Sequence, residues 1–235
     1  MSFNIYIPSY KRAKTCTTHK FLNYYTYVVR QSELQDYIDA GIDPDKIWAV
    51  EDKLIAGMVL VNDYIIKNAP EDIFVIVDDD LHHFYYRMEN TQEVNDPDTV
   101  TAELERIAQI MLDLDIGFGS VDATIRPYNY TQEFDFKGSS GGMRWVNKAV
   151  FKAKLNIDLE FAYDLDVVLQ ELLVNRIILK TKYFCSKGLT DTNEGGASDK
   201  QRNQQIATIQ NMRTKWGRYF DYNFKSNTPY IRVKR

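Results

Sequence analysis

The sequence predicts an α/β fold with a mostly parallel sheet flanked by helices. Short apolar runs typical of strands alternate with helical patterns from the N-terminus onward, as in consecutive βαβ units. The run 73–77 is apolar at every position, which indicates a strand buried on both faces. With 235 residues, 44% hydrophobic and 26% charged, the chain is long enough for one α/β domain with a sizeable core.

The elements follow in order along the chain. Residues 3–7, 26–29, 47–50 and 73–77 predict strands, and helical spacing predicts helices over 33–38, 55–66, 100–114 and 165–173, with a final basic helix. We expect Asp98 or Thr99 to cap the third of these helices. The polar stretches 90–98 and 190–198 predict loops, 138–142 predicts a glycine turn, and 177–184 predicts a late strand.

Composition excludes several classes of protein. The chain has no apolar run of the roughly 20 residues that cross a bilayer, and its N-terminus lacks a signal-peptide pattern, so we expect a cytoplasmic protein without a membrane partner. Cys16 and Cys185 have no metal-ligand spacing and are too few for a disulfide framework, so we expect two free thiols. Nothing in the sequence indicates an oligomeric state.

Charge is distributed unevenly. The net charge is −4, yet the residues from Lys200 onward hold nine lysines and arginines against one acid, Asp221. Such a basic segment on an acidic body indicates a polyanionic partner. The alternative is a basic helix whose charges are solvated or paired with the body's own acids.

Three adjacent carboxylates, Asp78, Asp79 and Asp80, follow the buried run 73–77. Ligands of parallel α/β sheets bind beyond the carboxyl ends of the strands, and a divalent cation would relieve the repulsion among the three charges. If the strand continues, Asp78 and Asp80 point the same way and form the better pair for Mg²⁺ or Mn²⁺. The alternative is that these acids only solvate a strand end; His82 and His83 would be further ligands or structural residues.

A second acidic group, Asp164 and Asp166, stands at the first turn of a predicted helix. Carboxylates are stabilised there by the helix dipole, and capping alone explains one of them. If this helix faces the same cleft as the triplet, one carboxylate would deprotonate an incoming hydroxyl.

These motifs, in this order, resemble the GT-A glycosyltransferases over roughly residues 3 to 185. The motifs are the strand ending in Ile7-Pro8-Ser9-Tyr10-Lys11-Arg12, the helix with Gly57 and Asn62, the aspartate triplet, the turn Gly141-Gly142, and Tyr163-Asp164-Leu165-Asp166. Their spacing is most similar to the small phage enzymes, often called TET/JBP-associated, that attach sugars to hydroxymethylated pyrimidines in DNA.

The resemblance implies a site as well as a fold. Asp78 and Asp80 would match the DxD motif that binds Mn²⁺ or Mg²⁺, and Asp164 would match the general base of an inverting transfer. Tyr163 replaces the expected glutamate, which leaves both Asp164 and Asp166 open as the base. Val61 replaces an expected arginine, so a phosphate contact would come from Lys53 or from the loop 193–198. The donor-binding residues would be Pro8, Ser9, Tyr10, Arg12, Arg30, Glu51 or Asp52, Lys53 and Asp79.

The resemblance also implies an activity and a division of the chain. Residues 1–90 would bind a nucleotide-sugar, most simply a UDP-sugar, and residues 91–198 would hold the acceptor side, with Gly141–Met143 near the acceptor. The basic extension 199–235 would bind DNA through cations that alternate with Trp216, Tyr219 and Tyr222; the alternative is that its aromatic residues are core residues that anchor the last helix. Two alternatives to the activity stay open: a protein or polysaccharide acceptor, and a non-catalytic nucleic-acid-binding protein.

Overall fold

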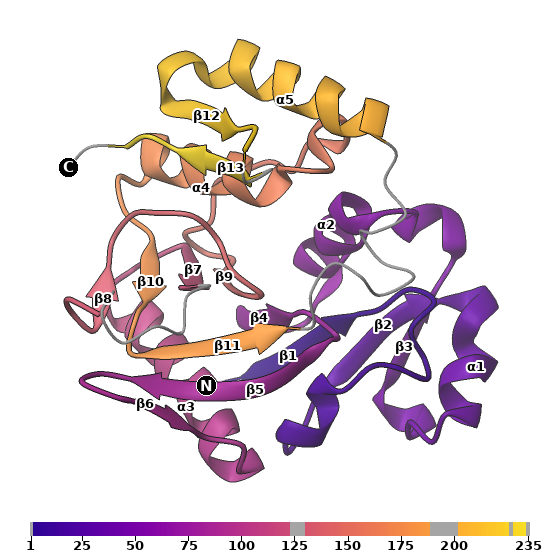
Figure 1. The fold of residues 1–235 in the computed structure, drawn as a ribbon. Helices are drawn as coiled ribbons and strands as arrows, with labels where there is room; N and C mark the ends of the chain where they lie inside the picture. Colours follow the sequence, from indigo (N-terminus) through magenta and orange to yellow (C-terminus); the bar gives the residue numbers. More distant parts are fainter. Residues whose placement is uncertain (1, 123–129, 189–201, 226–227, 234–235) are drawn as a thin grey trace.

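The computed structural model describes residues 2–122, 130–188, 202–225 and 228–233 (Figure 1). Its centre is an eight-stranded sheet in the order β3-β2-β1-β4-β9-β7-β10-β8. The strands are β1 (Phe3–Pro8), β2 (Thr26–Arg30), β3 (Ile47–Val50), β4 (Ile73–Val77), β7 (Phe118–Val121), β8 (Phe134–Asp135), β9 (Met143–Asn147) and β10 (Leu179–Thr181). The predicted loop 190–198 lies outside the described residues.

The N-terminal half of this sheet is parallel, as predicted. β1 pairs in parallel with both β2 and β4, and β2 with β3. The helices α1 (Leu34–Asp39) and α2 (Met58–Asn68) supply the crossovers that parallel strands need. β9 then inserts antiparallel between β4 and β7, with Arg144 opposite Ile76. This inserted strand places residues 143–147 beside the end of β4.

Both faces of the sheet are covered, which explains the unbroken apolar run of β4. Ile73, Val75 and Val77 pack with α3 (Pro97–Asp113) in one core cluster. Phe74 and Ile76 pack on the opposite face with α2 and α4 (Tyr163–Val174). The alternation of side chains along a strand thus divides one sequence run between two cores.

A smaller antiparallel sheet, in the order β11-β5-β6, begins directly after the aspartate triplet. It consists of β5 (Leu81–Arg87), β6 (Thr91–Glu93) and β11 (Phe184–Gly188). Three predictions are corrected here. The strand expected over 177–184 is two strands in different sheets, and the loop expected over 90–98 contains β6 and the start of α3. The side chain of Asp96, not of Asp98 or Thr99, caps α3, by accepting from the Thr99 amide at 2.9 Å.

The C-terminal segment packs on α4, above the sheet in Figure 1. It comprises α5 (Arg202–Trp216) and the hairpin of β12 (Phe220–Asn223) and β13 (Thr228–Ile231). Ile209, Met212, Phe220 and Tyr222 are buried against α4 and the 3-10 turn Ile157–Leu159. Within the residues that the structure describes, no helix is both long and apolar enough to cross a membrane.

Candidate active site

A cleft of about 650 Å³ opens at the carboxyl ends of β1 and β4, within the size range of ligand sites. It brings together most of the residues that the sequence predicts for a donor site. Those that line it are Pro8, Ser9, Tyr10, Arg12, Arg30, Asp78, Asp79 and Asp80. Its other walls come from the start of α2, from the segment 157–161, and from Ala207, Thr208 and Asn211 of α5.

The aspartate triplet forms a turn rather than an extension of the strand. β4 ends at Val77 and Asp79 and Asp80 lie in a turn before β5, so the expected alternation of Asp78 and Asp80 along a strand does not apply. Thr18 fixes this turn, because its hydroxyl donates to the Asp78 carbonyl at 2.6 Å and accepts from the Leu81 amide at 2.9 Å. The three carboxylates therefore have three different environments.

Asp79 points into the protein. Its carboxylate accepts from the Ser9 hydroxyl and from Arg12 at 2.9 Å, and Ser9 in turn accepts from Tyr37 at 2.6 Å. Burial raises the pKa of Asp79, while Ser9 and Arg12 act in the opposite direction. Asp79 thus ties the loop after β1 to the loop after β4 and shapes the cleft floor.

Asp78 and Asp80 face the cleft with separate cationic partners. Asp80 accepts from Arg12 at 3.0 Å and Asp78 from Arg144 at 2.7 Å. Burial, together with the charges of Asp78 and Asp79, raises the pKa of Asp80 to about 6. Gly142 passes so close to Asp78 that a Cβ there would lie 3.1 Å from its Oδ2 atom, which gives the predicted glycine turn a steric reason.

The residues present fit a hard divalent cation. Asp78 and Asp80 offer carboxylate oxygens on one cleft, and Mg²⁺-type sites with a bound diphosphate need only one or two protein carboxylates. Among the described residues no three acids, histidines or cysteines converge on one point, so substrate oxygens and water would complete the coordination. His82 and His83 do not line the cleft, and the ring of His83 instead bonds Glu93 at 2.7 Å.

A cation stacked on an aromatic ring forms one side of the cleft. The guanidinium of Arg30 lies 3.9 Å from the centre of the Tyr10 ring. This packing holds the arginine at the end of β2 against the loop after β1, as cation–π pairs do. The pair offers a flat surface and a positive charge to a ligand.

Three residues named for the donor site, Glu51, Asp52 and Lys53, do not line the cleft. Asp52 accepts from the Ser32 hydroxyl at 2.5 Å and from its amide at 3.1 Å, which ties two 3-10 turns together. Lys53 is 74% exposed and pairs with Glu51 at 2.7 Å. Val61 does line the cleft, so the wall is apolar at the position where the resemblance led us to expect an arginine.

Neither acid at the start of α4 lines the 650 Å³ cleft, although the sequence analysis expected one of them there. The two acids occupy different positions. Asp166 is 1% exposed, and its carboxylate accepts from Trp216 Nε1 and Lys215 Nζ, which anchors the end of α5. Gln170 also donates to it at 2.7 Å. Asp164 lies in a small void beside Arg144, Tyr163 and Asn62. Burial raises the pKa of Asp164 and the charge of Arg144 opposes this.

Glu160 and Arg144 are site residues that the sequence reasoning missed. Glu160 lines the cleft and accepts from the Met58 amide at 2.6 Å and the Val59 amide at 3.1 Å. It thereby satisfies orphan donors at the N-terminus of α2, a position that favours anions. Both residues act on partners more than 60 positions away, and no local pattern marks them.

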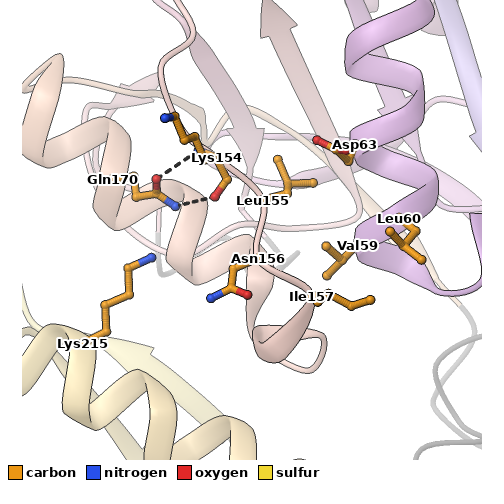
Figure 2. A pocket seen from close by; sticks show the side chains of 9 residues that line it. All are labelled: Val59, Leu60, Asp63, Lys154, Leu155, Asn156, Ile157, Gln170 and Lys215. Carbon is orange, nitrogen blue, oxygen red and sulfur yellow. Dashed lines mark hydrogen bonds between the residues drawn. The ribbon is translucent and has the colours of Figure 1, made fainter.

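A second cavity, of about 540 Å³, lies between α2, the segment 154–157, α4 and the end of α5 (Figure 2). Of its charged residues, Asp63 pairs with Lys67 at 2.6 Å and Lys215 pairs with Asp166. It contains neither the aspartate triplet nor an arginine. We therefore place the candidate active site in the 650 Å³ cleft.

The basic C-terminal segment is partly structural. Lys215 and Trp216 bond Asp166, and Tyr222 is buried, so these residues are not free to bind a partner as predicted. Phe220 is buried too, as the alternative of core aromatic residues expects. Arg218 and Lys225 are exposed, as are Tyr219 at 43% and Phe224 at 73%. Arg213 and Arg232 both pair with Asp221.

No known protein family and no curated protein matches the sequence. Solved structures do match the fold. A mycobacterial protein matches with a TM-score of 0.54 at 10% identity, over 98% of this chain and 82% of that chain. Glucosyl-3-phosphoglycerate synthase of Mycobacterium tuberculosis, solved with Mn²⁺, UDP-glucose and phosphoglyceric acid, matches with a TM-score of 0.52 at 10% identity, over 98% and 86%.

A fragment, residues 1–349, of TarS from S. aureus with UDP-GlcNAc has a TM-score of 0.48 at 10% identity, over 88% of this chain. The chain spans 64% of that fragment, less than two thirds of its length. The likeness to the synthase confirms the predicted fold class: the chain has a GT-A fold, a mostly parallel sheet flanked by helices. The narrower resemblance to DNA-modifying phage enzymes stays a prediction.

Proposed function

We propose that the chain is a metal-dependent glycosyltransferase that moves a sugar from a nucleotide-sugar, most simply a UDP-sugar, to a hydroxyl acceptor with inversion. One observation carries this proposal: Asp78 and Asp80 lie in one cleft with Arg12, Arg30 and Tyr10, at the carboxyl edge of a GT-A sheet. Synthase structures of the same fold hold UDP-glucose with Mn²⁺ and UDP with Mg²⁺. The carboxylates, the arginines and the aromatic ring expected around a nucleotide diphosphate thus line one cleft, which supports the proposal.

The chemistry assigns separate tasks to the residues. Arg30 and Tyr10 would hold the nucleotide, and Asp78 and Asp80 would bind Mn²⁺ or Mg²⁺. The bound cation supplies charge neutralisation of the departing diphosphate. Asp164 would accept the proton of the acceptor hydroxyl as its oxygen attacks the anomeric carbon. Asp164 is the better candidate than Asp166, because Trp216, Lys215 and Gln170 already bind the Asp166 carboxylate.

The donor site is tested by urea unfolding with a panel of nucleoside diphosphates, each with Mn²⁺ or with a chelator. A ligand at 100 times its Kd raises the free energy of unfolding by about 2.7 kcal/mol. We expect this rise for UDP with Mn²⁺, and its loss in Asp80→Asn. The matched control is Asp72→Asn, an exposed aspartate outside the cleft. If no nucleotide stabilises the wild-type protein with either ion, the donor site is refuted.

For the acceptor, we propose a hydroxymethylated pyrimidine in DNA. The exposed cations Arg218 and Lys225 with the exposed rings of Tyr219 and Phe224 support this acceptor, since such surfaces bind phosphates and stack bases. An enzyme that acts on a base must also take it out of the stack, and exposed rings would stabilise the opened strand.

The DNA proposal is tested with the double variant Arg218→Glu/Lys225→Glu. We expect weaker DNA binding, with a salt dependence reduced by about one phosphate contact for each residue, and unchanged binding of UDP. The control is Lys152→Glu/Lys154→Glu, which makes the same charge change at exposed positions outside the cleft. Equal losses in both variants would show only a general charge effect and would refute this role for the C-terminal segment.

A further inference from the structure

Arg144 is a buried arginine in the middle of the central sheet. It lies on β9, all five residues of which are buried, opposite Ile76 on β4. Arginine is rarely buried to this extent unless it has a specific partner. Its guanidinium reaches the point where β4 ends and the aspartate triplet begins.

We propose that Arg144 is a positioning residue for two carboxylates. It orients Asp78 on the donor side through a hydrogen bond, and its positive charge acts on Asp164 on the acceptor side. This inference rests on the proposed function. It adds a residue that neither the sequence pattern nor the comparisons assign. Three features of Arg144 support this role: its contact with Asp78, the space that it shares with Asp164, and the nitrogen of its guanidinium that has no hydrogen-bond partner among the described residues.

The contact with Asp78 fixes one carboxylate oxygen. Arg144 donates from Nη2 to Asp78 Oδ1 at 2.7 Å, a charge-assisted bond with only 9% of the arginine side chain exposed. Asp78 Oδ2 faces the Gly142 backbone and accepts no hydrogen bond within the described parts of the chain. Arg144 therefore fixes the orientation of Asp78, a residue that lines the cleft, through one of its two carboxylate oxygens.

The link to Asp164 runs through a small void. Arg144 and Asp164 line the same space, of about 20 Å³, with Asn62 and Tyr163, which is room for about one water molecule. The charged groups that act on Asp164 are Arg144 of β9 and Asp78 after β4. Of these, only Arg144 favours the carboxylate form, which a general base needs.

The third supporting feature is the Nε atom of Arg144. It is buried and has no hydrogen-bond partner among the described residues. A buried donor without a partner lowers stability, and a buried ion pair is often replaceable by apolar residues without loss of stability. Stability therefore does not explain an arginine at this position, whereas a role toward two functional carboxylates does.

The test compares Arg144→Met and Arg144→Lys with Arg87→Met. Arg87 is the matched control because it is also fully buried and pairs with an aspartate, Asp122, at 3.0 Å, but does not line the cleft. Four quantities are measured for each folded variant: the Kd for UDP with Mn²⁺, kcat and KM for transfer, and the pKa of Asp164 by carboxyl ¹³C NMR without ligand.

We expect Arg144→Met to weaken UDP binding about tenfold, to lower kcat about 100-fold and to raise the pKa of Asp164. Arg144→Lys keeps the charge, so it should restore the pKa of Asp164 and most of kcat while UDP binding stays weak. Arg87→Met should lose stability only. If Arg144→Met does not fold, Arg144→Lys alone tests the inference, because it should keep most of kcat while its Kd for UDP rises.

Two results would overturn the inference, and they differ from each other. If the wild-type protein binds UDP with Mn²⁺ and Arg144→Lys or Arg144→Met keeps wild-type Kd, kcat and Asp164 pKa, Arg144 is structural and the proposed function survives. If the wild-type protein binds no nucleotide with either ion, the proposed function fails and this inference fails with it.

Discussion

At the scale of single residues, Asp166 has a structural role. Its buried carboxylate accepts from Trp216 and Lys215, which hold the end of α5. Asp166→Ala leaves both donors unpaired, and we expect the free energy of unfolding to fall by about 1–3 kcal/mol in urea titrations. Asp72→Ala, at an exposed position, should change it by less than about 0.5 kcal/mol. A stable Asp166→Ala with a strongly reduced kcat would instead make Asp166 the base.

Residues of the site differ in how far the sequence could predict them. Asp78 and Asp80 were predictable, because an apolar run that ends in acids marks the functional edge of a parallel sheet. Asp79 was predicted for the donor site, and it lines the cleft, but its carboxylate points inward to Ser9 and Arg12. Arg144 could not be predicted, since its position beside Asp78 depends on the register of β9 against β4.

At the scale of elements, the start of α2 depends on Gly57. This residue has φ +138°, which other residues rarely adopt, and a Cβ there would lie 3.0 Å from Glu160 Oε1. Gly57→Ala should therefore lower the free energy of unfolding by about 1–3 kcal/mol and displace the carboxylate that caps α2, which urea titration and UDP binding would both report.

The comparison for Gly57→Ala is Gly41→Ala. Gly41 also has a positive φ, +91°, but a Cβ there meets nothing within 4 Å. Gly41→Ala thus carries the backbone strain without the displaced Glu160, and we expect the smaller loss of stability and no change in UDP binding. Equal effects of the two substitutions on both measurements would contradict the role assigned to the contact between Gly57 and Glu160.

The elements that were predicted wrongly share one physical cause. The apolar run 177–184 has the composition of a single strand, but β10 pairs in parallel with β7 while β11 pairs with β5. The hydrophobic periodicity and the composition of a run indicate how it is buried, but not which strand it pairs with. The parallel N-terminal half could be predicted because each crossover is local, whereas β5 and β11 meet across about 100 residues, with Tyr85 opposite Cys185.

At the scale of the whole molecule, α4 joins the sheet to the C-terminal segment. Val167, Val168 and Leu172 pack toward the sheet with α2, and Leu165 and Leu169 pack toward α5 and β12. A helix that is apolar on two sides is buried between layers. Because α5 also lines the cleft, the segment predicted as a basic extension contributes both to the core and to the candidate site.

The folded core as a whole should lose stability in alkali. Burial raises the pKa of the Cys185 thiol from the ordinary 9.0 to about 11, and burial also raises the pKa of Cys16. Between pH 9 and 11 the unfolded chain therefore loses thiol protons that the folded chain retains, so the free energy of unfolding falls as pH rises through this window. Urea titrations at pH 8, 9 and 10 measure this fall. The free energy of unfolding of Cys185→Ala should fall less steeply with pH than that of the wild type. Identical slopes would show that Cys185 ionises as readily in the folded protein as in the unfolded chain.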